Sequence, residues 1–259
     1  MSPGKSRPSK RPARQGKTTG LARALSKLGF CSRSQAFALI REGKVRLNGI
    51  APKNPSMPVR LGIDRIEVAG QRVAAAEKIY LMLNKPRGIV TTASDEKGRD
   101  TVYSLLPPDL DWIAPVGRLD KASEGLLLFT NDSAWAARIT DPLSHLDKTY
   151  HVQITAMADE KILAALSAGI TTSEGAFLKA KRVRLLRSGE KNSWIELVLD
   201  EGKNRQIRRL FDALNIEVLR LIRVAIGPLP LGDLAKSAYR RLTPQEKSAL
   251  DRALAHVNP

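Results

Sequence analysis

The sequence has little of several residues and patterns that would define common classes of protein. Cys31 is the only cysteine in 259 residues, so an intramolecular disulfide is excluded and a reducing compartment is expected. The three histidines (His145, His151 and His256) match no zinc spacing with that cysteine. No apolar run of about 18 residues could span a membrane, and the basic N-terminus lacks the apolar core of a signal peptide. We therefore expect a cytoplasmic protein with no membrane partner.

Acidic residues are also scarce relative to basic ones. The chain holds 43 lysines and arginines against 26 acids, which gives a formal net charge of +17. Such an excess favours a polyanionic partner, with nucleic acid as the first candidate. An anionic membrane surface is the second, but we find no long basic amphipathic helix that would bind one. Residues 1–77 carry 16 of the basic residues and only 4 acids, so the electrostatic anchor is expected there.

Residues 1–18 form a basic segment with three prolines and no acid. This composition predicts a disordered arm that contacts phosphates without sequence preference. A solubilising tail with no fixed partner fits the same composition equally well.

Residues 19–76 are expected to form a small basic domain. Apolar spacing predicts a helix over 21–28, and Ser32 with Gln35 forms a capping-box pattern that opens a helix to Glu42. Residues 45–49 alternate like a strand and enter an Asn-Gly turn, which predicts a hairpin. A further strand is expected over 65–68. Six cations lie within 24 residues of this domain: Arg23, Lys27, Arg33, Arg41, Lys44 and Arg46.

Residues 77–259 mix strand and helix patterns. Strands are expected over 79–83 and 148–154, and a helix capped by Asn131-Asp132 over 133–140. A further helix is expected to open at Asn204, as its N-cap, with an apolar stripe that includes Ile207. These patterns predict an α+β domain with a mainly antiparallel sheet.

One loop in this part of the chain carries several reactive side chains. Gly117 and Gly125 bracket it, and an apolar run that follows predicts a buried strand. The loop residues are Arg118, Leu119, Asp120, Lys121, Ala122, Ser123 and Glu124. A carboxylate held on a glycine-flanked loop beside a buried strand suits covalent or acid–base chemistry. An ordinary polar turn is the alternative.

The helix expected after Asn204 is basic in its first turns. Arg205, Arg208 and Arg209 act against the helix dipole unless an anion lies opposite. A carboxylate or an RNA phosphate would supply that anion, whereas a solvated basic face would need none.

Three stretches occur in the order of one known family. Residues 83–88 (LNKPRG), 117–128 (GRLDKASEGLLL) and 204–210 (NRQIRRL) resemble the RsuA/RluB-type rRNA pseudouridine synthases. Residues 21–28, 29–33 and 43–49 resemble the S-four-type RNA-binding domain that precedes the catalytic domain in this family. The likeness covers about residues 20–245, and its departures (Ser123, Lys203 and Gln206) are conservative.

The resemblance implies isomerisation of a uridine in RNA, with no cofactor and no metal. Asp120 matches the essential aspartate, which forms a covalent or ion-pair partner with the base or the sugar. Tyr150 matches the tyrosine that stacks on the uracil, and Arg208 the basic residue that pairs with the aspartate. Ile207 matches the apolar residue lining the pocket, and Arg118 the arginine that occupies the space left by the flipped base.

We therefore expect a disordered arm (1–18), an RNA-binding domain (19–76) and a pseudouridine-synthase-like catalytic domain (77–259). The expected RNA contacts are Arg23, Lys27, Arg33, Lys44, Arg46, Lys85, Arg87, Arg205 and Arg209. The expected partner is ribosomal RNA or a pre-ribosomal particle, bound by a monomer. The third stretch favours large-subunit rRNA over small-subunit rRNA. Two alternatives are a non-catalytic ribosome-assembly factor and a hydrolase that uses Asp120 and Glu124 as an acid–base pair.

Overall fold

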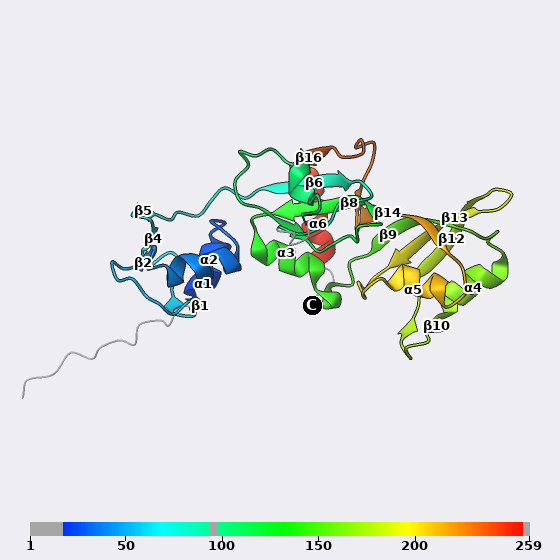
Figure 1. Cartoon of the computed structure of the whole chain (residues 1–259), viewed down its shortest axis with the longest axis horizontal. Coiled ribbons are helices and arrows are strands. Elements are labelled where there is room, and N and C mark those ends of the chain that lie inside the picture. Colours follow the sequence, from blue (N-terminus) through cyan, green and yellow to red (C-terminus); the bar gives the residue numbers. More distant parts are fainter. Residues whose placement is uncertain (1–17, 94–97, 256–259) are drawn as a thin grey trace, which may run out of the picture. The chain divides into compact units, whose positions relative to one another are not determined.

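The computed structural model describes residues 18–93 and 98–255 (Figure 1). The chain divides into two compact units, one up to Ala75 and one from Ala76 onward. The basic arm predicted over residues 1–18 lies outside the described residues, apart from Thr18. Within the two described ranges, no helix is long and apolar enough to cross a membrane.

The first unit packs two helices against short strands. The elements are β1 (Thr19–Gly20), α1 (Leu21–Lys27), α2 (Arg33–Arg41), β2 (Val45–Leu47), β3 (Pro58–Val59), β4 (Ile66–Val68) and β5 (Gln71–Arg72). The capping box is confirmed, since Ser32 Oγ accepts from the Gln35 amide and Gln35 Oε1 accepts from the Ser32 amide. Cys31 is buried in the core of this unit, and burial raises the pKa of its thiol to about 11. It is a packing residue.

The predicted hairpin at Asn48-Gly49 is wrong in its second strand. The turn forms, with positive φ at both residues, but Leu47 makes only an isolated bridge to Ile50. Strand β2 pairs instead with β4, and β4 with β5, to form an antiparallel sheet. A proline at position 52 follows the turn, and proline lacks the amide that a continuing strand ladder needs.

The second unit is built on one large sheet. The strands of this sheet are β6 (Tyr80–Lys85), β7 (Ala114–Val116), β8 (Glu124–Thr130), β9 (Lys148–Ile154), β12 (Arg182–Ser188), β13 (Ser193–Leu199), β14 (Val218–Ile226), β15 (Leu229–Pro230) and β16 (Tyr239–Arg241). Strands β10 (Ile170–Thr171) and β11 (Phe177–Leu178) form a separate antiparallel pair. The helices of this unit are η1 (Val102–Leu105), α3 (Ser133–Thr140), η2 (Pro142–Ser144), α4 (Glu160–Ala168), α5 (Gln206–Asp212) and α6 (Pro244–Ala255).

Among the described residues, the sheet runs in the order β12-β13-β9-β14-β8-β6-β16, with β7 on β8 and β15 on β14. The β14–β8 pair is parallel and the other pairs of this sheet are antiparallel. The expected α+β class with a mainly antiparallel sheet is confirmed.

Strand β8 is buried along its whole length, as its apolar run predicts. On one face Leu126 and Leu128 join a core with residues of α3 and α6. On the other face Leu127 and Phe129 join a core that includes Val102 of η1. Because both faces are covered, β8 is a rigid support for the loop that precedes it.

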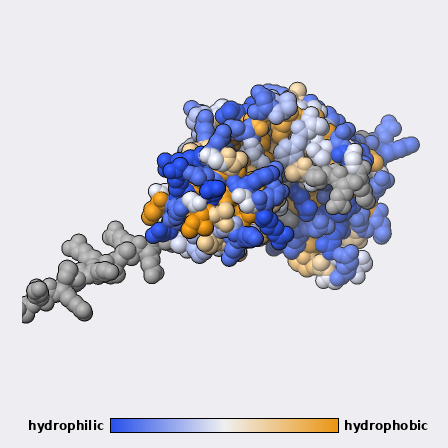
Figure 2. All heavy atoms as spheres, turned by 60° about the vertical axis from the view of Figure 1, so that its left-hand side comes forward, coloured by the Kyte–Doolittle hydropathy of each residue, from blue (hydrophilic) through white to orange (hydrophobic). Residues whose placement is uncertain are grey.

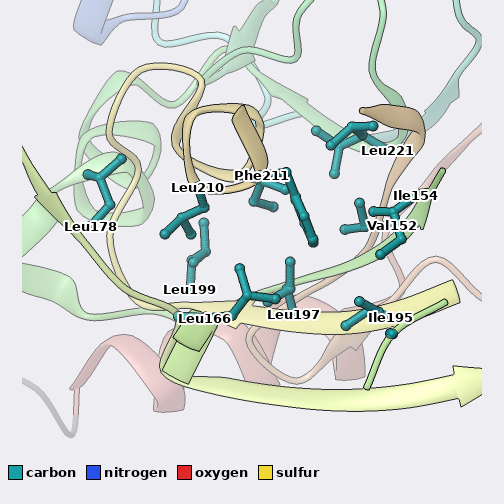
Figure 3. Packing of buried hydrophobic residues seen from close by; sticks show 14 residues of the cluster. Val152, Ile154, Leu166, Leu178, Ile195, Leu197, Leu199, Leu210, Phe211 and Leu221 are labelled. Carbon is teal, nitrogen blue, oxygen red and sulfur yellow. The ribbon is translucent and has the colours of Figure 1, made fainter. Parts of the chain in front are cut away.

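A third core lies between α4, α5 and the strands β9, β13 and β14. Figure 3 shows Leu210 and Phe211 pointing from α5 toward the sheet, where Leu197 and Leu199 of β13 lie. These two helix residues are fully buried. Fully burying a side chain of this size is worth about 1.5–3 kcal/mol, so α5 is fixed firmly over the sheet.

The predicted N-cap of α5 is wrong. The N-cap residue is Arg205, which has a left-handed backbone with φ of 48° and makes no side-chain cap hydrogen bond. Gln206 instead ties down this end, because its side chain donates to Glu201 Oε1 and the Lys179 carbonyl. Its Oε1 also accepts from the Lys203 amide.

Hydrophilic residues predominate on the face shown in Figure 2, and hydrophobic residues form small separate groups there. The most exposed large apolar residues of the first unit are Ile50 and Ile63, each 69% exposed. The hydrophobic groups on that face do not join into a continuous apolar area.

Candidate active site

Two of the three stretches that carry the family resemblance, residues 117–128 and 204–210, contribute to the lining of one cleft in the second unit, and the third stretch bonds to the Asp120 loop through Lys85. The lining includes Asp120 from the loop between β7 and β8, Tyr150 from β9 and Ile207 from α5. The cleft encloses roughly 270 Å³. This lies near the lower end of the roughly 300–1,000 Å³ typical of small-molecule sites. One nucleotide therefore fits it better than a folded segment of RNA.

The backbone of the Asp120 loop is held by Lys85 at the end of β6. Lys85 is fully buried, and its Nζ donates to the carbonyls of Asp120 (3.1 Å), Ser123 (2.8 Å) and Pro86 (3.0 Å). Burial lowers the pKa of Lys85 to about 8, although the charges of Asp120 and Glu124 oppose that shift. The expectation that Lys85 contacts RNA is therefore wrong, because its ammonium faces the protein interior.

Arg208 of α5 also holds this loop. Its Nη2 donates to the Ala122 carbonyl at 3.2 Å and its Nη1 to the Val218 carbonyl at 3.3 Å. Burial lowers the pKa of Arg208, and the charge of Asp120 acts against that shift. Among the described residues there is no direct ion pair between Arg208 and Asp120. The pairing implied by the family resemblance is a through-space interaction in this structure.

The Asp120 carboxylate itself is free. It is half-buried and makes no hydrogen bond or ion pair with any described residue, while its backbone accepts from Lys85 and Ser123. Its charge interacts with the nearby cations of Lys85 and Arg208. An ionised carboxylate without a hydrogen-bonded partner has its lone pairs available to attack a substrate.

Tyr150 and Ile207 form the apolar wall of the cleft. Tyr150 is half-buried and packs against the core beneath α5, and Ile207 is 3% exposed. No described residue bonds to the Tyr150 hydroxyl. Arg118 is exposed at the edge of the cleft. All five residues predicted to act on the substrate therefore lie in the second unit, four of them on the cleft, and Arg208 is bonded to the Asp120 loop.

Glu124 does not take part in the cleft. It is buried, and its carboxylate bonds to Arg220 Nε and Nη2, both at 3.1 Å, and to Lys236 Nζ at 3.2 Å. Burial alone would raise the pKa of Glu124, but Arg220 and Lys236 outweigh that effect and lower it. An acid–base pair of Asp120 and Glu124 is excluded by this arrangement.

The predicted RNA contacts of the first unit lie on its surface. Arg23, Arg33, Lys44 and Arg46 are exposed and Lys27 is half-buried. Lys44 pairs with Glu42 at 2.7 Å. In the second unit, Arg205 is exposed on the cleft, and exposed Arg87 donates weakly to the Leu219 carbonyl at 3.4 Å. Arg209 pairs with Glu174 at 2.8 Å, which makes it less available to a phosphate.

Three basic residues of the cleft are absent from the predicted site: Lys148, Lys203 and Arg223. The sequence could have identified Lys148 as a site residue. It lies two residues before Tyr150 on a predicted strand, and strand residues two apart share a face. Arg223 lies on β14, a strand that the sequence analysis did not identify. Among the described residues, no group of three or more His, Cys, Asp or Glu side chains could hold a metal ion.

Comparisons with known proteins match both units of the chain. The RNA pseudouridylate synthase family matches residues 79–213, and the S4 domain matches residues 19–63. A ribosomal large subunit pseudouridine synthase B of Bacillus subtilis is 39% identical over 91% of this chain and 96% of its own length. An uncharacterized RNA pseudouridine synthase of Aquifex aeolicus is 36% identical over 89% of this chain and 92% of its own length.

A crystal structure of a pseudouridylate synthase is similar across both units. It is 32% identical, has a TM-score of 0.64, and the match covers 90% of this chain and 99% of that one. The family match spans over half of this chain, and the similarity to these relatives extends through nearly their whole length. The chain is therefore an enzyme of the RNA pseudouridylate synthase family, with an S4 domain in front of its catalytic domain.

Proposed function

We propose that this enzyme converts one specific uridine of large-subunit ribosomal RNA to pseudouridine, with Asp120 as the nucleophile. The observation that carries the proposal is the free Asp120 carboxylate in a nucleotide-sized cleft walled by Tyr150 and Ile207. The choice of large-subunit rRNA rests on the Bacillus subtilis relative, which is named for that subunit.

The reaction breaks the bond between uracil N1 and the ribose, turns the detached base, and joins C5 of the base to the same ribose carbon. N1 gains a proton and C5 loses one, so no atom or electron enters or leaves. Asp120 forms a covalent or ion-pair intermediate with the base or the sugar. Tyr150 stacks on the uracil and assists the removal of the C5 proton.

A uridine within folded RNA must leave its stack to reach the cleft, at a cost of a few kcal/mol. Stacking on an aromatic ring such as Tyr150 returns about 1–3 kcal/mol. Arg118, exposed at the cleft edge, is placed to fill the gap that the base leaves in the RNA. The exposed cations of the S4 domain supply the sequence-independent part of the binding energy.

The substrate is ribosomal RNA or a pre-ribosomal particle in the cytoplasm, and the enzyme acts on it as a monomer. The single cysteine and the charge of +17 support this assignment, because both fit an RNA-binding protein in a reducing compartment.

Pseudouridine mapping on unmodified large- and small-subunit rRNA, free and in assembly particles, tests the proposal. Wild type should create one new site in large-subunit rRNA, and Asp120→Asn should create none while still binding the RNA. A site in small-subunit rRNA would contradict the assigned substrate. Tight binding with no new site on any of these RNAs would favour a ribosome-assembly factor over an enzyme.

A further inference from the structure

Arg223 is a buried cation with an unused hydrogen-bond donor. It lies on β14, lines the cleft and is only 6% exposed. Its Nε donates to the Leu126 carbonyl at 2.7 Å, which fixes the side chain on the sheet. Its Nη2 is buried and has no hydrogen-bond partner among the described residues. Buried polar groups are rarely left in this state, and each one calls for an explanation.

Lys148 is a second cation on the same wall. It lies on β9, lines the cleft and is half-buried. Burial lowers the pKa of Lys148, and the charge of Arg223 lowers it further. Its side chain makes no ion pair or hydrogen bond with any described residue. The two like charges are therefore near enough to repel one another, and no described acid forms an ion pair with either of them.

Two acids interact electrostatically with Lys148, but neither forms an ion pair or hydrogen bond with it. Asp147 pairs with Lys181 at 2.7 Å, and Asp200 lies 3.9 Å from His145. Both favour the charged form of Lys148, but their effect is smaller than that of burial. The other buried or half-buried cations behind the cleft, Lys85 and Arg208, bond to backbone carbonyls. The Nε of Arg208 is also buried without a partner, but Arg208 does not line the cleft, whereas Lys148 and Arg223 do.

The sheet places this pair beside the base-stacking residue. Tyr150 lies directly opposite Arg223 across the β9–β14 pair, and Lys148 precedes Tyr150 by two residues on the same face of β9. Keeping two like charges together in a partly desolvated wall is unfavourable unless an anion binds between them. Arginine and lysine are the usual partners of phosphate groups.

We propose that Lys148 and Arg223 form a subsite for the backbone phosphodiester that adjoins the nucleotide bound in the cleft. The inference rests on the proposed function, because it takes the occupant of the cleft to be a nucleotide of RNA. The pair holds the phosphate while the base stacks on Tyr150. The backbone is then anchored within the cleft itself, while the surface cations hold the RNA outside it.

Binding of small nucleotides to the full-length protein tests this subsite without any turnover. The probes are uridine, uridine 5′-monophosphate, uridine 3′-monophosphate and inorganic phosphate, with dissociation constants from calorimetry or ligand-observed NMR. Wild type should bind one of the two monophosphates at least about tenfold more tightly than uridine, since a charged hydrogen bond contributes roughly 1.5–3 kcal/mol. Lys148→Gln should remove most of that preference and leave uridine binding unchanged.

Two variants control for charge and for folding. Lys161 is exposed on α4 and does not line the cleft. Lys161→Gln makes the same chemical change there and should keep the full preference for the monophosphate over uridine. Lys148→Arg retains the cation and should also keep it. Arg223→Gln should act like Lys148→Gln if it folds, and the Lys148 variants decide the question if it does not.

Several outcomes would overturn the subsite. The first is equal binding of uridine and both monophosphates. The second is no saturable binding of either monophosphate below about 10 mM. The third is a loss of uridine binding in Lys148→Gln that is as large as its loss of monophosphate binding. Inorganic phosphate that binds as tightly as the monophosphates would mean a free-anion site instead.

The phosphate preference should persist in Asp120→Asn. A preference that is present while pseudouridine mapping fails would therefore refute the proposed function and leave the subsite standing.

Discussion

At the scale of single residues, the charged groups of the site divide by what they touch. Lys85 and Arg208 donate to backbone carbonyls and so fix the shape of the Asp120 loop. The side chains of Asp120 and Lys148 have no hydrogen-bond partner among the described residues, and the arginines are intermediate, since Arg223 Nη2 and Arg208 Nε lack a partner while their other nitrogens bond to carbonyls. Groups that bond to the backbone support the site, and groups left free are available to substrate.

Lys85 should make folding stability depend on pH. Its pKa is about 8 in the folded protein and about 10.4 in an unfolded chain, so the unfolded chain binds more protons between these values. The free energy of unfolding of wild type relative to Lys85→Met should therefore rise, by up to roughly 3 kcal/mol, from pH 8 to pH 10.5. Urea unfolding across this range measures the difference. Parallel pH profiles of the two proteins would contradict the burial of a charged Lys85.

The Tyr150 hydroxyl and the Tyr150 ring should make separable contributions. Tyr150→Phe keeps the stacking surface and removes the hydroxyl, so RNA binding should change less than about twofold while the single-turnover rate falls by about 10² or more. Tyr150→Leu should weaken binding as well. If Tyr150→Phe turned over at the wild-type rate, the hydroxyl would have no role in the chemical step and Tyr150 would act by stacking alone.

At the scale of elements, the cleft depends on the close approach of β14 to β8. Gly125 has φ of +102°, and a Cβ there would lie 2.3 Å from the Arg223 carbonyl oxygen and 2.8 Å from the Arg223 amide nitrogen. No side chain fits at that distance. The parallel pair that carries both the Asp120 loop and Arg223 therefore requires glycine at this position.

Gly125→Ala should destabilise the protein by about 3 kcal/mol or more, since it adds a backbone clash to an unfavourable φ. Gly88→Ala is a matched control, because Gly88 has a similar φ of +99° but open space around it. It should cost only about 1 kcal/mol. Urea denaturation measures both, and equal effects of the two substitutions would mean that the β8–β14 approach tolerates a methyl group.

Elements defined by local signals are predictable from this sequence, and those defined by distant interactions are not. The helix 133–140 and the strand 148–154 match the structure because a cap and a period-two pattern mark them. The cap of α5 depends instead on hydrogen bonds of Gln206 with Lys179 and Glu201. The partner of β2 is a strand some twenty residues away, which a turn signal does not specify.

The same distinction applies to the site. Asp120, Tyr150 and Ile207 could be found from motifs, and the structure brings them to one cleft. The burial of Lys85 could not be foreseen, because lysine is almost never fully buried and Arg87, a second cation, lies two residues away. Arg223 was not predicted for a related reason. Its place in the site follows from the pairing of β14 with β8 and β9, which local sequence signals do not specify.

At the scale of the whole molecule, net positive charge is concentrated in the first third of the sequence, whereas the candidate active site belongs to the second unit. Residues 1–77 carry 16 basic residues and 4 acids, against 27 and 22 in the remainder. In the S4 domain, Arg23 and Arg33 are exposed and have no ion-pair partner among the described residues. Binding strength and choice of uridine should therefore be separable between the domains.

Replacing Arg23, Arg33 and Arg46 together by glutamine should weaken binding to all RNA sequences alike. The logarithm of the RNA-binding constant decreases linearly with the logarithm of the salt concentration. The magnitude of this slope should decrease by roughly one for each phosphate that the variant no longer neutralises. Arg60→Gln is the control, because Arg60 is exposed in the same unit but pairs with Asp64 at 3.2 Å. Filter binding from about 50 to 300 mM salt gives these slopes. An unchanged slope in the triple variant would place the anchor elsewhere in the chain.

The most direct test of the proposed chemistry is the single-turnover rate of Asp120→Asn on the mapped rRNA substrate, measured beside its RNA affinity. Because the carboxylate is free of protein partners and no other acid lines the cleft among the described residues, we predict a rate at least about 10⁴-fold below wild type with affinity within about threefold. Turnover within about tenfold of wild type would contradict the assignment of Asp120 as the nucleophile.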